Sequence, residues 1–296
     1  RAARRVEGLG ADGDRMSASD GVPSQAPQRA VAGAGVAAIV AGALVLGADG
    51  WERGAFLVLG GLLGLTLYHA AFGFTSAYRR AFAVRDLSGV GAVAPVAVQV
   101  AIGSAMFGLG MQLAGGCGSG TLYTVGGGST RMVLALAAFC FGGFWATLHF
   151  GFWSGLPSLG SISLAESFGW EAALPMQLGA LVVIWLALKR WARGTQQRPL
   201  WQGPWDWRQL AVGPWPLLLG GIVLALLNWA TLVIAGHPWT ITWAFTLWGA
   251  KAAAALGWDP ATSAFWTGGF PENALGRGIL EDTTSVMDIG IMLGAL

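Results

Sequence analysis

The sequence contains few charged residues. Only 11% of its 296 residues are Asp, Glu, Lys or Arg, whereas 54% are hydrophobic. A typical soluble domain carries about 25% charged residues. The mean hydropathy of +0.58 and the 16 tryptophans fit apolar helices in a bilayer, with aromatic side chains at its interfaces. We therefore predict an all-α polytopic membrane protein rather than a soluble globular one.

Cysteine and histidine are also scarce. Cys117 and Cys140 are the two cysteines, they form no C-x-x-C pair, and the three histidines do not cluster. Metal sites and dithiol redox centres have such clusters as their signatures. We expect no metal ion and no cofactor. The net charge of +2 gives no reason to expect nucleic acid as a partner.

Long apolar runs provide the predicted membrane helices, because a spanning helix needs about 20 residues. They lie near 31–48, 54–74, 89–112, 131–150, 172–188, 211–235 and 239–257, followed by a shorter run at 286–296. We predict a polar N-terminal segment over 1–29 and a membrane domain over 30–296. Met16 is the expected native start, with 1–15 as translated upstream sequence, and the domain is expected to be truncated after Leu296.

The basic residues test the topology, because cytoplasmic loops are enriched in Lys and Arg. Two clusters are present, Arg79, Arg80 and Arg85 in one and Lys189, Arg190, Arg193 and Arg198 in the other. Three apolar runs separate the clusters, and an odd number would place them on opposite sides. A return passage within 113–130 removes the conflict. We predict a re-entrant or broken element there, with a half-helix from near Cys117 to near Arg131.

This predicted break coincides with the glycine-rich sequence "LAGGCGSGTLYTVGGGSTRM" at 113–132. A helix that begins inside the membrane presents unpaired N–H groups and a partial positive charge, which favour an anion. Glycines allow an anion to approach the backbone closely. The candidate anion-binding residues are Gly115, Gly116, Cys117, Gly118, Ser119, Gly120 and Thr121.

Helix packing is the alternative explanation of the same residues. Glycines in membrane helices commonly serve close packing, and a lone cysteine commonly behaves as a small hydrophobic residue. A nucleotide-binding loop is a weak interpretation, because no strand precedes the glycines. Composition and spacing alone leave packing and anion binding open.

The sequence resembles the YeeE/YedE membrane proteins, which carry the sulphur-transport domain and take up thiosulfate. The resemblance rests on the cysteine block above and on three further segments. These are "LYHAAFGFTSAYRR" at 67–80, "GHPWTITWAFTLWGAK" at 236–251 and "TSVMDIGIMLGAL" at 284–296. It extends over most of the chain from about residue 54.

The resemblance implies two pseudo-symmetric helical halves, with half-helices meeting at a central pore. Thiosulfate would be relayed by S–H···S contacts between cysteines and held by helix N-termini, with Cys117 as the central cysteine of the first half. Some members carry a further cysteine where this chain has Gly73, and the second-half cysteine block is not present in this sequence. Cys140 matches no motif position and is interpreted as a packing residue.

A few charged residues elsewhere deserve separate interpretation. Lys251 follows a long uncharged run and is a secondary candidate as an anion attractor, the alternative being a snorkelling side chain at a helix end. The acidic stretch containing Glu272, Glu281, Asp282 and Asp288 is interpreted as a solvated loop. A helix is expected to follow, capped within 283–285.

Together these observations predict a multi-pass transporter or channel of the bacterial inner membrane, not an enzyme. It would take up thiosulfate or a related sulphur-containing anion. Membrane lipid and a small cytoplasmic sulphur-carrier protein are the other expected partners. Two alternatives remain open: a membrane sulphur transferase or redox protein using Cys117 as persulfide or disulfide, and a purely structural membrane subunit.

Overall fold

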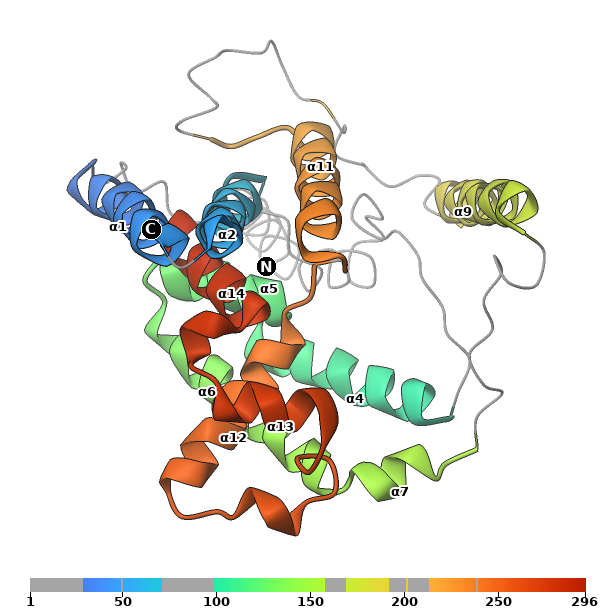
Figure 1. Ribbon diagram of the computed structural model, residues 1–296. Coiled ribbons are helices and arrows are strands. Elements are labelled where there is room, and N and C mark those ends of the chain that lie inside the picture. The colour runs from blue at the N-terminus through green and yellow to red at the C-terminus, as the bar shows by residue number, and fades with distance from the viewer. Residues whose placement is uncertain are drawn as a thin grey trace, which may run out of the picture. The chain divides into compact units, whose positions relative to one another are not determined.

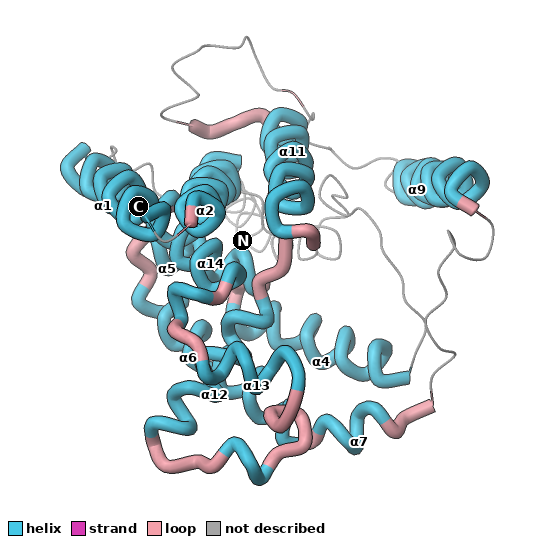
Figure 2. The backbone as a smooth tube through the Cα atoms, viewed as in Figure 1, coloured by secondary structure: helices cyan, strands magenta, loops and turns pink. Residues whose placement is uncertain are grey.

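A computed structural model describes residues 29–48, 50–70, 98–157, 169–191, 201, 213–237 and 239–296. The chain divides into two units, 1–34 and 35–296, and the description below concerns the second. Within the described residues every regular element is a helix (Figure 2). This confirms the predicted all-α class.

Within the described residues the helices overlap each of the predicted apolar runs. The longer ones are α1 (Arg29–Ala48), α2 (Trp51–Ala70), α4 (Val98–Ala114), α6 (Thr130–Leu148), α9 (Trp170–Trp191), α11 (Leu217–Ala235) and α12 (Thr242–Ala255). The shorter ones are α5 (Gly118–Gly126), α7 (Phe150–Ser154), α13 (Gly269–Gly276) and α14 (Thr283–Gly294), with 3-10 turns η2 (Pro260–Thr262) and η3 (Ile279–Glu281).

Three of the described helices are long and apolar enough to cross a membrane. The segments are Val31–Ala48, Thr130–Leu148 and Leu217–Ala235. Large apolar side chains such as Leu44, Leu134 and Trp229 remain exposed along them. Such a surface suits lipid rather than water, so the chain is a helical membrane protein.

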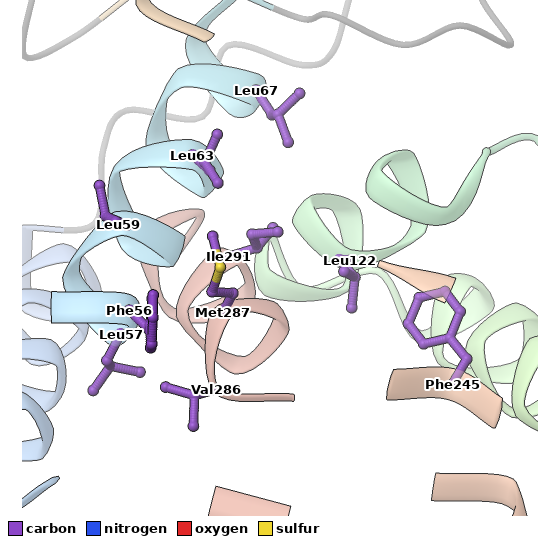
Figure 3. Packing of buried hydrophobic residues seen from close by; sticks show 10 residues of the cluster. All are labelled: Phe56, Leu57, Leu59, Leu63, Leu67, Leu122, Phe245, Val286, Met287 and Ile291. Carbon is purple, nitrogen blue, oxygen red and sulfur yellow. The ribbon is translucent and has the colours of Figure 1, made fainter. Parts of the chain in front are cut away.

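The centre of the core is the short helix α14, which packs between α2 and α5 (Figure 1). Met287 and Ile291 of α14 lie between the leucines of α2 and Leu122 of α5 (Figure 3). Glycines bring the backbones together, because a Cβ on Gly64 would overlap the Ile291 carbonyl and one on Gly126 would overlap that of Met292. Small residues at helix contacts are typical of membrane proteins.

A second contact joins α6 to α12. A Cβ on Gly249 would overlap the carbonyl oxygen of Cys140, so the two helices cross at backbone distance. Near the C-terminal end of α6, the buried Trp266 donates its indole N–H to Thr147 Oγ1 at 2.8 Å. The bond satisfies both polar groups inside an apolar cluster, which fixes the 260–268 segment against α6.

The acidic stretch differs from its prediction in two ways. Helix α14 begins at Thr283, close to the expected position, but its N-cap is Asp282, whose carboxylate accepts from Ser285 N at 2.8 Å. The prediction that the cap lies within 283–285 is therefore wrong. Asp288 is also not solvated, because it is fully buried in α14.

Candidate functional site

The glycine-rich stretch interrupts the helix in the predicted place. Helix α4 ends at Ala114, the chain turns at Gly115 with a φ of 83°, and α5 begins at Gly118. That φ lies in the left-handed region, where glycine has no steric penalty. The start of α5 agrees with the predicted half-helix from near Cys117, but α5 ends at Gly126, and Arg131, the expected end, lies in α6. Its re-entrant path in the membrane stays a prediction.

Cys117 caps the N-terminus of α5. Its backbone is extended, with φ −85° and ψ −175°, and its Sγ accepts the Gly120 N–H at 3.3 Å. Ser119 Oγ lies 3.4 Å from the same sulphur. A Cβ on Gly120 would lie only 3.3 Å from Sγ, so the glycine leaves room for the thiol to turn over the helix end. Cys117 as a whole is 6% exposed.

Several hydrogen-bond donors at this helix end have no acceptor. Among the described residues, nothing accepts the N–H groups of Gly118 and Ser119, the first two of α5. Thr121 Oγ1 is also without a partner, although Thr121 is 0% exposed. Buried donors are nearly always paired in proteins. Unpaired donors gathered at the positive end of a helix are the arrangement that binds an anion.

The remaining candidate residue Gly116 lies beside this set. A Cβ there would lie 3.3 Å from Thr121 Oγ1, so only glycine leaves that hydroxyl unobstructed. On the other side, Gly118 packs against Ile241 and Phe245 of the α12 region. Apolar neighbours exclude water and strengthen charge–dipole interactions. The structure thus brings Gly115, Gly116, Cys117, Gly118, Ser119, Gly120 and Thr121 together at one helix end.

The comparison with known proteins decides the family. The sequence profile for sulphur transport matches residues 70–296, which include the whole cysteine block. The chain belongs to the sulphur transport family. Its general role is therefore the transport of a sulphur-containing anion across a membrane. No curated protein and no solved structure matches the chain.

Arg131 is a charged residue near the end of the cysteine block in this sulphur transport protein. It lies in the first turn of α6, and its Nη2 donates to the Leu113 carbonyl at the end of α4 at 3.3 Å. A Cβ on Gly115 would lie 3.9 Å from the same nitrogen. The guanidinium therefore holds the two sides of the helix break together.

Lys251, the secondary candidate, forms its hydrogen bonds with the end of α13 rather than with the cysteine block. Its ammonium donates to the Leu275 carbonyl at 2.7 Å and to the Arg277 carbonyl at 2.5 Å. These carbonyls belong to the C-terminal end of α13, where a cation is favoured. A role as anion attractor stays a prediction.

Cys140 differs from Cys117 in its position, because it does not lie at a helix N-terminus. It lies within α6 at the crossing with α12, half-buried against the apolar core. Both cysteines are free thiols. Among the described residues no group of His, Cys, Asp and Glu could hold a metal ion.

Other predicted features lie partly outside the described residues. The structure does not describe the first basic cluster, Gly73, Arg193 or Arg198. The topology inferred from the basic residues therefore stays a prediction. Lys189 and Arg190 end α9. The sequence interpretation assigned Asp288 to a solvated loop and missed its burial, although an acidic residue inside "SVMDIGIMLGAL" is itself a signal, since ionisable side chains in apolar segments are often functional.

Proposed function

We propose that this sulphur transport protein takes up thiosulfate or a closely related sulphur-containing anion across the bacterial inner membrane. The observation that carries the proposal is the buried thiol of Cys117 at a helix N-terminus surrounded by unpaired donors. A simple packing role for the glycines does not require those donors to be left without acceptors.

Thiosulfate suits both parts of this site. Its oxygens match the N–H groups of Gly118 and Ser119 and the hydroxyl of Thr121, since hydrogen bonds to an anion are roughly twice as strong as neutral ones. Its terminal sulphur is soft and polarisable, as is Cys117 Sγ. The thiol contacts the anion as an S–H donor and passes it onward without forming a covalent bond, so no enzymatic step is needed.

The surroundings of the site favour release as well as binding. The unpaired donors at the start of α5 are backbone N–H groups and the Thr121 hydroxyl, and the described bond of Arg131 is to the Leu113 carbonyl, so the anion is held mainly by dipoles rather than by full charges. A transport site must bind well enough to load and weakly enough to unload. Helix dipoles of partial charge meet that requirement. The cargo would then pass to a small cytoplasmic sulphur-carrier protein.

Uptake by the full-length protein tests the proposal. Cells without another thiosulfate uptake route should accumulate radiolabelled thiosulfate when they express the protein, with saturable kinetics. Sulfate is the informative competitor, because it has the oxygens but lacks the soft sulphur, and it should compete poorly. Accumulation no greater than that of a vector control would refute the proposal.

A further inference from the structure

A second buried polar group lies in the core and takes no part in the site at Cys117. Asp288 of α14 is 0% exposed, and neither of its carboxylate oxygens has a hydrogen-bond partner. No described residue forms an ion pair with it. Its neighbours Val286, Met287 and Ile291 belong to the apolar core.

The position of Asp288 on α14 relates it to the cysteine block. Residues three or four apart share a helix face. Ser285, three residues before, accepts the indole N–H of Trp248 on α12 at 3.0 Å. Met292, four residues after, places its carbonyl against Gly126 of α5. Asp288 therefore lies on the face of α14 that meets α12 and α5, the helix whose other end Cys117 caps.

The charged and titratable groups around Asp288 offer it no counter-charge. Cys140 of α6 and Asp282 at the start of α14 lie within electrostatic range, and neither is a cation. Lys251 of α12 is bound to the carbonyls at the end of α13. The other titratable groups on the packed elements are Glu52, Arg53, Tyr68 and His69 near the ends of α2, Tyr123 of α5 and Glu281 of η3.

The contact between α2 and α14 extends from Leu57 to Gly64, where a Cβ on Gly290 would overlap the Leu57 carbonyl and one on Gly64 would overlap that of Ile291. Arg53 is four residues before Leu57 and His69 is five after Gly64, which is about 6–8 Å along the axis. Neither forms a hydrogen bond with the carboxylate oxygens of Asp288. An ionised carboxylate in this apolar position is strongly unfavourable. A proton is the smallest group that removes the charge.

We propose that Asp288 is a proton-binding site through which anion transport is coupled to proton entry. The inference rests on the proposed function, since it needs an anion to be transported. An anion at the N-terminus of α5 and an ionised Asp288 repel one another, so loading of the anion favours protonation, and protonation favours loading. Both would be released together on the other side.

The sign of the pH effect follows from this linkage. Acidification of the side from which the anion enters protonates Asp288 and raises the rate of uptake. A higher pH on the opposite side removes that proton and promotes release of the anion. A proton gradient directed inward therefore accelerates uptake, and each anion that enters brings a proton with it.

Reconstituted vesicles of the full-length protein provide the test. Initial uptake of radiolabelled thiosulfate is measured with the outside acidic and again without a gradient, while a dye reports the internal pH. For the wild type we expect uptake to rise at least fivefold with the gradient and internal pH to fall as thiosulfate enters. Asp288→Asn, which keeps the size and stays neutral, should lose both responses but retain thiosulfate exchange between the two sides.

Asp259→Asn is the matched control, because Asp259 is exposed and caps η2, a role that Asn also fills. It should respond as the wild type does. A full gradient response in Asp288→Asn, or a wild type driven by sodium rather than protons, would overturn the inference while leaving anion transport intact.

A failure of the proposed function is distinguishable from a failure of the coupling. Wild-type vesicles that show neither uptake nor exchange of thiosulfate contradict the proposed function, and they thereby also refute the proton coupling. If Asp288→Asn does not fold, the wild type decides alone, since thiosulfate entry without proton entry refutes the inference.

Discussion

At the scale of single residues, the site depends on which polar groups are satisfied and which are not. Cys117 Sγ is engaged by Gly120 N–H, and Thr124 Oγ1 donates to the Gly120 carbonyl at 2.5 Å. Thr121, on the same short helix and fully buried, has no such bond. A buried hydroxyl left unpaired costs free energy, which makes Thr121 a candidate ligand of the proposed anion.

Thr121→Val tests that interpretation, because it removes the hydroxyl while keeping the shape. A hydrogen bond to a charged group contributes about 1.5–3 kcal/mol, so we expect the KM for thiosulfate to rise about tenfold or more. The thermal stability should not fall, since no internal bond is lost. Thr124→Val is the control on the same helix and should leave KM within about twofold. Equal effects of the two substitutions would argue against Thr121 as an anion ligand.

Lys251→Met tests the second candidate residue. Because the ammonium is bound to the α13 carbonyls, its loss should reduce the melting temperature by a few degrees, given about 2–4 °C per kcal/mol in a chain of this size. The KM should stay within about twofold. Lys189→Met, which removes an ammonium lying 4.9 Å from the Trp185 ring, is the comparison. A large rise in KM with unchanged stability would instead support Lys251 as an anion attractor.

At the scale of elements, close packing of short helices positions the site. Helix α5 has only nine residues and α14 only twelve, too few to cross a bilayer alone. They pack against α2, whose glycines allow the α14 backbone to approach closely. The half-helices therefore derive their stability from tertiary contacts rather than from helix propensity.

Gly64→Ala tests this packing. The added methyl would overlap the Ile291 carbonyl, which is backbone and can yield only if α14 moves. Overpacking of this kind costs about 1–3 kcal/mol, so the melting temperature followed by tryptophan fluorescence should fall by several degrees. Gly221→Ala in α11 adds a methyl where no atom lies within 4 Å and should cause no loss. A similar loss in both variants would contradict the account of α2 and α14.

The elements differ in how far the sequence predicts them. Helix α5 was predictable because glycine content and the charge count both indicated a break at 113–130. The segment from Gly257 to Asp282 was not, because α13 and the two 3-10 turns have no long apolar period. Asp282 stands among polar residues, whereas Asp288 stands between Met287 and Ile289 in an apolar run, so the sequence did carry a signal of its burial. That neither carboxylate oxygen of Asp288 has a hydrogen-bond partner is evident only from the packing of α14.

At the scale of the whole molecule, the membrane determines the energetics. Moving a dianion such as thiosulfate to the negative side of a membrane costs about 2.3 kcal/mol per charge at 100 mV, or about 4.6 kcal/mol in total. Dipoles at a helix end lower the barrier within the protein but do not supply this free energy. One coupled proton offsets about half of it, about 2.3 kcal/mol at 100 mV, and the pH and concentration gradients must supply the rest, which is the physical reason to measure protons alongside thiosulfate.

The membrane class followed from composition alone, since hydrophobic residues outnumber charged ones several-fold. The unpaired donors around Cys117 could not be foreseen in the same way. The sequence places Ser119 two residues and Thr121 four residues after the cysteine, and only the fold shows that Ser119 Oγ faces the sulphur while Thr121 Oγ1 is left without a partner.

The two cysteines allow the central claim to be measured most directly. Initial rates of radiolabelled thiosulfate uptake are compared for the wild type, Cys117→Ser and Cys140→Ser, at equal amounts of protein in the membrane. The account predicts a loss of at least tenfold for Cys117→Ser, because oxygen replaces the soft sulphur at the anion site, and a rate within about twofold of the wild type for Cys140→Ser. Uptake that survives in Cys117→Ser at the wild-type rate would contradict it.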